Sequence, residues 1–596
     1  MLNPDTWADR AASFPLAPQS RTGVRHADYL RVIESIVRYF SRFQDQRGAI
    51  IDPYAGEEKQ YSTPCFALGA ALGAVRGLAP DLLEPAARAL DRALAALVVE
   101  RNTPQRHADF FAPLVVLAYR LLKGRVEPQR AARWKAWLEA IDPEACYTDV
   151  LANRPPERIH NWNVVAVAGE MLRLRDGLGA SPDWIARYLA LQLERNFDQD
   201  SGLYRDPHCP LPYDLFPRYH LGYALADGYE GPYAPVLREL LARGEWMSLL
   251  TQTGSGGIPP GWRSSEHLWN DAALVALCEV AARRYAVAGA TALASAFKRA
   301  AGRAFRSLEW WLRSSGELHI VKNHMDPALR HGFESYSFHS NYGLYPAAML
   351  ATACLYGDDA VPEGPAPVDI GGFVVQYPRE FHRLLANAGG LTVLLDLGAD
   401  GHYDVTGVNT LRRVGSHPLL GPSCGIPAAP RYHVPEPPGE ARALGPAWQD
   451  SSGSWQSLAG LMPHGTDVRV LRQEPDCVEF TVTWRVQAGG AARVHSQYRL
   501  TPRRLDVHEA IEGSTLAVRA VFPFLADDGR DRPAVSLDGD RTLRVACGGT
   551  VQRFGVWHTD AKLRVSERRL AFRNGFAGVA LAERRGSEIA YFVTYE

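Results

Sequence analysis

The chain has 596 residues, of which 46% are hydrophobic and 22% are charged, and its formal net charge is −1. A chain of this length exceeds what a single hydrophobic core usually supports, so we expect at least two domains. The near-zero net charge argues against nucleic-acid binding and against attachment to a membrane surface, because both need an excess of basic residues on one face. No run of about 18 apolar residues occurs, so no membrane span is predicted.

The first residues and the cysteines bear on the compartment. Residues 1–20 contain no basic stretch followed by an apolar run, so we expect no secretory signal and a cytoplasmic protein, or a periplasmic one if a leader has been removed. The eight cysteines are scattered without close pairs. This spacing favours reduced thiols over a disulfide framework or a zinc knuckle.

Residues from about 25 to 356 follow a helical pattern. In the first segment, Tyr29, Ile33, Ile36, Val37 and Phe40 recur at helical spacing. About twelve such segments are joined by loops that contain Pro and Gly. Twelve helices in successive hairpins predict an (α/α)6 toroid. A superhelical repeat array is the alternative, but the chain lacks the strict sequence repeat that such arrays show.

The pattern changes after a segment rich in Pro and Gly at 358–372. From there on, short runs rich in Val, Thr, Phe and Tyr alternate with period two and are separated by turn residues, as in 478–486. This pattern predicts a C-terminal antiparallel β-sandwich. We therefore expect a toroid domain at 1–365 and a sandwich domain at 366–596.

Two groups of polar and aromatic residues lie in the middle of the helical part. His160, Asn161 and Asn163 crowd the start of an apolar helix, where an N-cap explains one asparagine but not the whole group. The second group belongs to a proline-rich segment, which we interpret as a structured loop leading into a helix from about residue 219. Such a loop either carries function or plugs the end of a toroid. Its candidate residues are Tyr213, Arg218, Tyr219 and His220.

Two further groups follow. Arg263 lies on a loop and is suited to a bidentate clamp on a carboxylate, and Ser264 or Ser265 is predicted to cap a helix that carries Glu266, His267 and Asp271. A capping box with a surface His–Asp pair is the alternative. In the other group Tyr336, His339 and Tyr342 recur every three residues, so we expect them to line one helical face near its start.

A pair of residues near the start of the β half is a weaker candidate. His402 and Asp404 lie two apart beside a glycine. A His-x-Asp pair is usually a polar turn and less often part of a metal site.

The residue types in these groups indicate a chemistry. No Gly-x-Ser-x-Gly, P-loop, His-Glu-x-x-His or Gly-x-Gly-x-x-Gly motif stands out. His, Tyr, Asn and Arg suit β-elimination from a uronic acid, whose weakly acidic C5 proton becomes removable when donors neutralise the carboxylate. A Tyr or His then serves as the base, and a Tyr protonates the leaving oxygen.

At these residues the chain resembles the heparinase II/III and oligoalginate lyase group, which joins an α/α-toroid to an antiparallel β domain. The run His160 to Asn163 looks like the Asn–His pair of that group. Tyr213, with Tyr219 as its rival, takes the place of the catalytic tyrosine, and the turn at 400–404 resembles a reduced form of a histidine-rich turn. The resemblance implies a polysaccharide lyase that acts on a uronate-containing glycan, needs no cofactor and has at most a structural divalent metal in its β domain.

In this scheme Asn161 and Arg263 neutralise the substrate carboxylate. His160 assists as neutraliser or base, Tyr213 is the acid and a candidate base, and Tyr336 and His339 complete the far wall. The residues predicted to be catalytic are His160, Asn161, Tyr213 and His339. The residues predicted to bind substrate are Asn163, Arg218, Tyr219, His220, Arg263, His267, Tyr336 and Tyr342.

Two other readings stay open. The first alternative is a glycoside hydrolase, because the helical half is also similar to toroidal glycoside hydrolases of the glucuronidase type, which need two carboxylates flanking the scissile bond. The second alternative is a non-catalytic glycan-binding protein with a broad aromatic groove. The sugar, the linkage and the oligomeric state stay open as well. Carboxylates available for hydrolysis are Asp109, Glu170, Asp206, Asp214, Glu266, Asp271 and Glu334.

Overall fold

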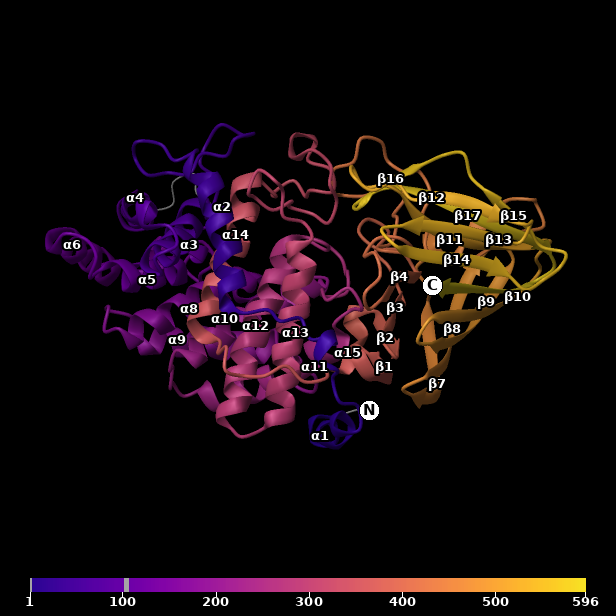
Figure 1. Ribbon diagram of the computed structural model, residues 1–596, viewed down its shortest axis with the longest axis horizontal. Helices are drawn as coiled ribbons and strands as arrows, with labels where there is room; N and C mark the ends of the chain where they lie inside the picture. The colour runs from indigo at the N-terminus through magenta and orange to yellow at the C-terminus, as the bar shows by residue number, and fades with distance from the viewer. Residues whose placement is uncertain (1–2, 101–106) are drawn as a thin grey trace.

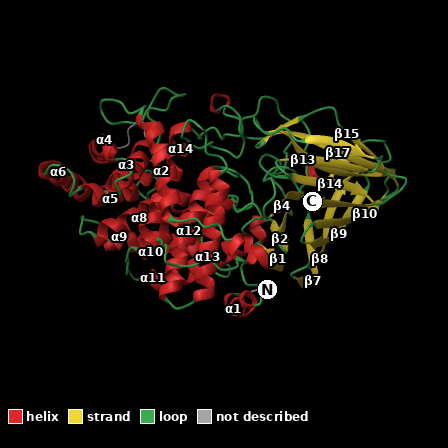
Figure 2. Cartoon of the chain, viewed as in Figure 1, coloured by secondary structure: helices red, strands yellow, loops and turns green. Residues whose placement is uncertain are grey.

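The computed structural model describes residues 3–100 and 107–596. Helices occupy the first part of the chain and antiparallel sheets the last, as predicted (Figure 1, Figure 2). The helices are α1 (Pro4–Ala12), α2 (His26–Ser41), α3 (Ser62–Val75), α4 (Leu83–Ala95), α5 (Phe111–Leu122), α6 (Pro128–Glu139), α7 (Pro143–Cys146), α8 (Asn161–Arg175), α9 (Pro182–Arg195), α10 (Leu211–Ala226), α11 (Ala234–Thr251), α12 (Leu268–Val287), α13 (Thr291–Glu309), α14 (His339–Tyr356) and α15 (Pro367–Ile370).

Six of these helices form a closed inner ring. In the described part of the chain α3, α5, α8, α10, α12 and α14 each contact the next, and α14 contacts α3. Helices α2, α4, α6, α9, α11 and α13 pack outside this ring against their chain neighbours. This arrangement is the predicted (α/α)6 toroid.

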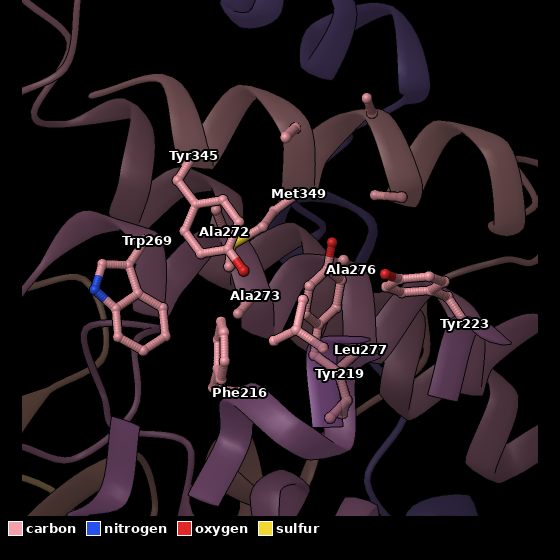
Figure 3. Packing of buried hydrophobic residues seen from close by; sticks show 14 of the residues in the cluster. Phe216, Tyr219, Tyr223, Trp269, Ala272, Ala273, Ala276, Leu277, Tyr345 and Met349 are labelled. Carbon is pink, nitrogen blue, oxygen red and sulfur yellow. The ribbon is translucent and has the colours of Figure 1, made fainter. Parts of the chain in front are cut away.

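The composition of each layer explains its position. Helix α12 is buried on all sides from Leu268 to Ala282, and its Ala272, Ala273 and Ala276 let neighbouring helices approach closely (Figure 3). The outer helix α2 instead buries one stripe, which contains the predicted apolar positions Tyr29 to Phe40, and exposes the opposite face.

Strands fill the C-terminal part. They are β1 (Gly371–Gln376), β2 (Arg383–Ala388), β3 (Leu391–Asp396), β4 (Gly407–Arg413), β5 (Gly445–Gln449), β6 (Trp455–Ser457), β7 (Gly465–Glu474), β8 (Cys477–Ala488), β9 (Ala491–Thr501), β10 (Arg504–Gly513), β11 (Ala517–Asp527), β12 (Ala534–Asp538), β13 (Thr542–Cys547), β14 (Thr550–Val556), β15 (Lys562–Val565), β16 (Leu570–Phe572), β17 (Gly575–Arg585) and β18 (Glu588–Tyr595). An eight-stranded sheet in the order β12-β13-β14-β18-β10-β9-β8-β7 faces a sheet in the order β15-β17-β11-β5-β6, with β16 paired to β17. Both sheets contribute to one core, as a sandwich requires.

A separate sheet of β1 to β4 joins the two parts. Phe373, Val375 and Leu385 on one face belong to the toroid core, whereas Val374 and Leu384 on the other face belong to the sandwich core. Because successive side chains of a strand point to opposite faces, this sheet packs against both parts at once. The predicted boundary at 365/366 lies in the segment between the end of α14 and the start of β1.

Two expected helix starts are wrong. Helix α10 begins at Leu211 rather than near residue 219, because Pro212 occupies the first turn, where its missing N–H costs nothing, and Pro217 is tolerated inside the helix. Helix α12 begins at Leu268 rather than after a capping serine. Ser264 and Glu266 have φ of +56° and +60°, which is left-handed backbone and prevents an earlier start.

The search for membrane-spanning helices gave a negative result for the described residues. None of their helices combines the length and the apolar composition that crossing a bilayer requires.

Candidate functional site

A pocket with a volume of about 730 Å³ lies at the N-terminal ends of the six inner helices. Its wall consists of residues from the first two turns of these helices and from the segments that lead into them. The lining residues are Glu57, Glu58, Lys59, Gln60, Tyr61, His107, Phe110, Thr148, Arg154, Trp162, Tyr213, Phe216, Arg263, Trp269, Tyr336, Phe338, Tyr342 and Tyr345.

The electrostatics of this wall favour an anionic ligand. The first N–H groups of a helix have no partner within it and carry partial positive charge, so six converging N-termini attract negative groups. Among the described residues, the cations Lys59, Arg154 and Arg263 also line the pocket, paired with Glu57, Asp149 and Asp206 respectively. Of the two lining carboxylates, Glu58 is held by Arg92, with an oxygen-to-nitrogen distance of 2.9 Å, and Glu57 by Lys59.

A chain of hydroxyl groups crosses the pocket wall. The Tyr213 hydroxyl lies 3.2 Å from Ser264 Oγ, and Ser264 Oγ lies 3.0 Å from the Tyr336 hydroxyl. Burial raises the pKa of Tyr336 well above its ordinary value, and the negative charge of Glu334 adds to this rise. Tyr336 is therefore a neutral phenol that can donate a hydrogen bond through Ser264.

Arg263 lies directly above Tyr213. Its guanidinium carbon is 4.0 Å from the centre of the Tyr213 ring, and it forms an ion pair with Asp206. Asn161 Nδ2 donates to the same Asp206 carboxylate at 2.6 Å. Burial alone lowers the pKa of Arg263, but the negative environment that includes the Asp206 carboxylate raises it further than burial lowers it. The guanidinium therefore stays charged beside the phenol.

The loop that carries Arg263 is strained and held from both parts of the protein. Trp262, Ser264 and Glu266 all have positive φ, a conformation that costs about 1–3 kcal/mol for each non-glycine residue and is concentrated at functional sites. Glu334 Oε1 accepts from the Ser264 N–H at 2.7 Å and from Arg573 Nη1 at 2.9 Å. Because Arg573 follows β16, the β part of the chain fixes the loop in the pocket.

Aromatic rings cover much of the remaining wall. Tyr61 stacks on Phe110 with ring centres 4.4 Å apart, and Trp162 meets the His107 ring edge-on at 4.0 Å. Figure 3 shows Phe216, Trp269 and Tyr345 converging from α10, α12 and α14. Flat apolar faces beside polar edges suit the stacking of sugar rings.

The structure brings four of the predicted site residues into this pocket: Tyr213, Arg263, Tyr336 and Tyr342. Asn161 lies behind them through its bond to Asp206. Its Oδ1 is buried without a partner, as is Nδ1 of His160. Burial lowers the pKa of His160, although Asp206 opposes the shift, so the ring is neutral and able to accept a proton.

The other predicted residues lie outside the pocket lining. Asn163 donates to the Asp149 carbonyl, Arg218 pairs with Asp214, and the Tyr219 hydroxyl bonds Thr352. His220 lies between the hydroxyls of Tyr223 and Tyr345 at 2.8 Å each, and burial lowers its pKa to about 3.

Two predicted histidines are buried beside the pocket. His267 lies 3.1 Å from Glu334 Oε2 and packs against the Tyr342 ring, so it supports the wall from behind. His339 is enclosed by the rings of Tyr39, Phe40 and Tyr54. Both ring nitrogens of His339 are buried without a partner.

Several lining residues were not predicted, notably Lys59, Tyr61, Arg154 and Trp162. Arg154 lies on the loop that leads to α8, and the other three stand near the start of an inner helix or just before it, as Tyr213 does. That shared position was the available signal. It becomes informative only when the closed ring is known.

The carboxylates proposed for hydrolysis do not face each other across the pocket. Glu170 pairs with Arg173, Asp271 with Lys322, and Glu266 with Arg412. Asp109 differs, because it lies against Asp149, whose N–H donates to Asp109 Oδ1 at 2.9 Å. Burial raises the pKa of both carboxyls, that of Asp149 to about 6.

His402 and Asp404 are bound to protein groups. His402 Nδ1 bonds the Ala429 carbonyl, while Asp404 accepts from the Trp262 N–H and pairs with Arg383. In the described residues, the sets of three ligand atoms close enough to share a metal lie elsewhere, around Asp531. There His417 Nδ1 accepts from the Leu419 N–H, so the neutral ring presents N–H rather than a lone pair to Asp531.

Comparison with solved structures identifies glycan-acting enzymes as neighbours of this fold. The chondroitin AC lyase of Streptomyces coelicolor A3, solved with chondroitin sulphate, matches 99% of this chain and 82% of its own at 14% identity and a TM-score of 0.52. The heparan sulfate lyase HepC of Pedobacter heparinus matches 88% of this chain and 91% of its own at 11% identity and a TM-score of 0.35. A possible GH105 family member of Salmonella enterica matches 56% of this chain and 97% of its own at 14% identity and a TM-score of 0.37.

The first of these matches supports the two-part fold over nearly the whole chain. No protein-family model matches the sequence, and the search of curated proteins finds no similar sequence. The fold class is therefore an (α/α)6 toroid followed by a C-terminal antiparallel β-sandwich.

Proposed function

We propose that this protein is a lyase that cleaves a uronate-containing glycan by β-elimination. The observation that carries the proposal is the pairing of Arg263 with Tyr213, at 4.0 Å, in an aromatic pocket where six helix N-termini converge. A uronate bound there would place its carboxylate against a permanent cation and partial positive charges. These groups stabilise the negative charge that develops when the C5 proton leaves.

The proton transfers follow from the hydroxyl chain. Tyr213 would give its hydroxyl proton to O4 of the leaving sugar as the C4–O4 bond breaks. Its oxygen would take the C5 proton as the C4=C5 double bond forms, so that the phenol is restored. Arg263 above the ring attracts negative charge that develops on the phenol oxygen. Ser264 and Tyr336 would hold that oxygen in place through their hydrogen bonds.

Sugar stacking on the aromatic wall would orient the glycan, and Arg154 adds a second guanidinium to the wall beside Arg263. The polar partners of the substrate would therefore be cations and phenols. Within the described part of the chain, the carboxylates that line the pocket are the adjacent Glu57 and Glu58, and both are engaged by cations. An elimination mechanism uses this set directly, whereas hydrolysis needs opposed carboxylates.

Hydrolysis by a glucuronidase-type mechanism is the second candidate, favoured by the pair Asp109 and Asp149. A carboxyl whose pKa is raised to about 6, as in Asp149, can serve as a general acid near neutral pH. Both carboxylates, however, accept backbone N–H groups of residues 148, 149, 160 and 163, which hold them in the wall.

Product analysis separates these candidates. The purified protein would be incubated with chondroitin, heparan sulfate, alginate and polyglucuronate, and the products analysed by mass spectrometry. Elimination predicts fragments lighter by one water than hydrolysis products, with an unsaturated sugar at the new non-reducing end. Saturated products that disappear in Asp149→Asn would replace the lyase assignment with the hydrolase.

A further inference from the structure

A second cavity, of about 300 Å³, lies where the outer helix α13 meets the start of the β part. Arg299, Arg303, Arg306 and Trp310 line it from the helix, while Ser255 and Ser416 line it from the loops on either side. The cavity therefore combines cations, hydroxyl groups and an indole. It is separate from the main pocket, with which it shares no lining residue.

The described lining residues of the cavity include three arginines and no carboxylate. The carboxylates that pair with its arginines are Glu309, Glu363 and Asp369, and none of them is among its lining residues. A ligand in the cavity would thus meet guanidinium edges without facing the acids behind them. Arg299 and Arg303 are held by Asp369 from behind, which fixes their orientation before a ligand arrives.

One arginine of this wall is held firmly by the protein. Arg303 is 8% exposed, donates Nη2 to the Gly254 carbonyl at 2.8 Å and donates Nη1 to Asp369 at 3.2 Å. A ligand would therefore meet the small exposed part of a guanidinium that is already oriented. Gly256 keeps the loop close to this helix, because a Cβ there would lie 2.3 Å from the Arg303 carbonyl oxygen.

Trp310 supplies the apolar part of the cavity. The Trp310 side chain is 44% exposed, although exposing an indole to water is costly. Arg530 lies 5.4 Å from the centre of its ring. His417 meets the ring edge-on at 5.9 Å, so the indole is fixed in position. A fixed indole beside guanidinium groups suits a sugar ring that bears a carboxylate or sulfate.

We propose that this cavity is an accessory binding site for one acidic sugar unit of a glycan chain, distinct from the pocket at Arg263. Arg303 and Arg306 bind the carboxylate or sulfate, and Trp310 stacks on the sugar ring. This inference does not depend on which reaction the main pocket catalyses. It predicts tighter retention of long acidic glycans than the main pocket alone provides.

Affinity electrophoresis tests the proposal. Every protein carries Tyr213→Phe so that the gel polymer stays intact, and the gels contain chondroitin sulfate, alginate or uncharged dextran. The test variant is Trp310→Ala/Arg306→Ser, whose side chains lie at the surface of the cavity. A matched control is Trp557→Ala/Arg504→Ser, because Arg504 lies 4.8 Å from the ring of the exposed Trp557.

We expect an acidic glycan to retard the parent protein and the Trp557/Arg504 control equally. The Trp310/Arg306 variant should bind at least about fivefold more weakly, as expected for loss of a charge-assisted contact, and dextran should retard none of them. Equal retardation of the test variant and the parent, or no retardation of the parent by any acidic glycan, would overturn the proposal. Absence of an unsaturated product would refute the lyase assignment without changing these binding results.

Discussion

Replacing Arg573 with Met tests how the β part holds the pocket loop. Arg573 is buried, bonds Glu334 at 2.9 Å and lies 4.1 Å from the Tyr432 ring centre. Its removal leaves the Glu334 carboxylate buried beside His267. Because burial lowers the pKa of His267, that ring is neutral, and no full positive charge remains next to the carboxylate. Removing one partner of a buried ion pair typically costs about 3–5 kcal/mol.

The strained loop adds to this effect. Glu334 holds the Ser264 N–H, and Ser264 in turn contacts both Tyr213 and Tyr336. We therefore expect Arg573→Met to lower the free energy of unfolding by about 3–5 kcal/mol and to lower kcat by more than it changes KM. The double variant Arg573→Met/Glu334→Gln should recover part of the stability, because the uncompensated charge is gone.

Urea denaturation followed by tryptophan fluorescence measures the four corners of this double-mutant cycle. Arg564→Met is the control, since Arg564 is exposed on β15 of the same half. A coupling free energy below about 1 kcal/mol, or wild-type stability in Arg573→Met, would refute the reasoning.

Two further predictions concern stability. Burial raises the pKa of Glu509 from 4.5 to about 8. Between these two pH values the folded chain keeps a proton that the unfolded chain releases. The free energy of unfolding therefore falls, by up to about 1.4 kcal/mol for each unit by which the pH rises. Glu509→Gln, which keeps an acceptor for the Tyr591 hydroxyl, should flatten urea profiles measured from pH 5 to 8; parallel profiles would contradict this. Gly169→Ala should lower the free energy of unfolding by about 1–3 kcal/mol, because the added Cβ would lie 2.4 Å from the Cβ of Ala112. Gly222→Ala in α10 should raise it by up to about 1 kcal/mol, because a Cβ there meets nothing within 4 Å. Thermal melts that rank these two variants in the opposite order would refute the packing argument.

The two-part fold was predictable because it rests on local periodicity. The stripe from Tyr29 to Phe40 is one buried helix face, and β8 alternates buried and less buried residues along most of its length. The start of α10 was not predictable in this way, because prolines in its first turn and interior resemble a loop. Secondary structure that tertiary packing imposes on such a segment leaves no periodic signal.

The site was predictable only in part. Tyr213 and Phe216 lie three residues apart on the helix face that lines the pocket, and His220 continues that face one turn deeper, against Phe216 and Tyr345. Arg218 instead pairs with Asp214 on another face of the helix. A cluster in sequence therefore divides between two faces once the helix forms. Lys59 and Trp162 are isolated in sequence and reach the site only through closure of the inner ring.

The central claim is that Tyr213 carries out a β-elimination, and ultraviolet absorbance of the conjugated unsaturated uronate tests it most directly. Wild type, Tyr213→Phe and Tyr219→Phe would be followed with the same uronate-containing glycans. Tyr219 is the matched control, because its hydroxyl bonds Thr352 outside the pocket lining. The account predicts rising absorbance with wild type and Tyr219→Phe and none with Tyr213→Phe, while wild-type absorbance in Tyr213→Phe would contradict it.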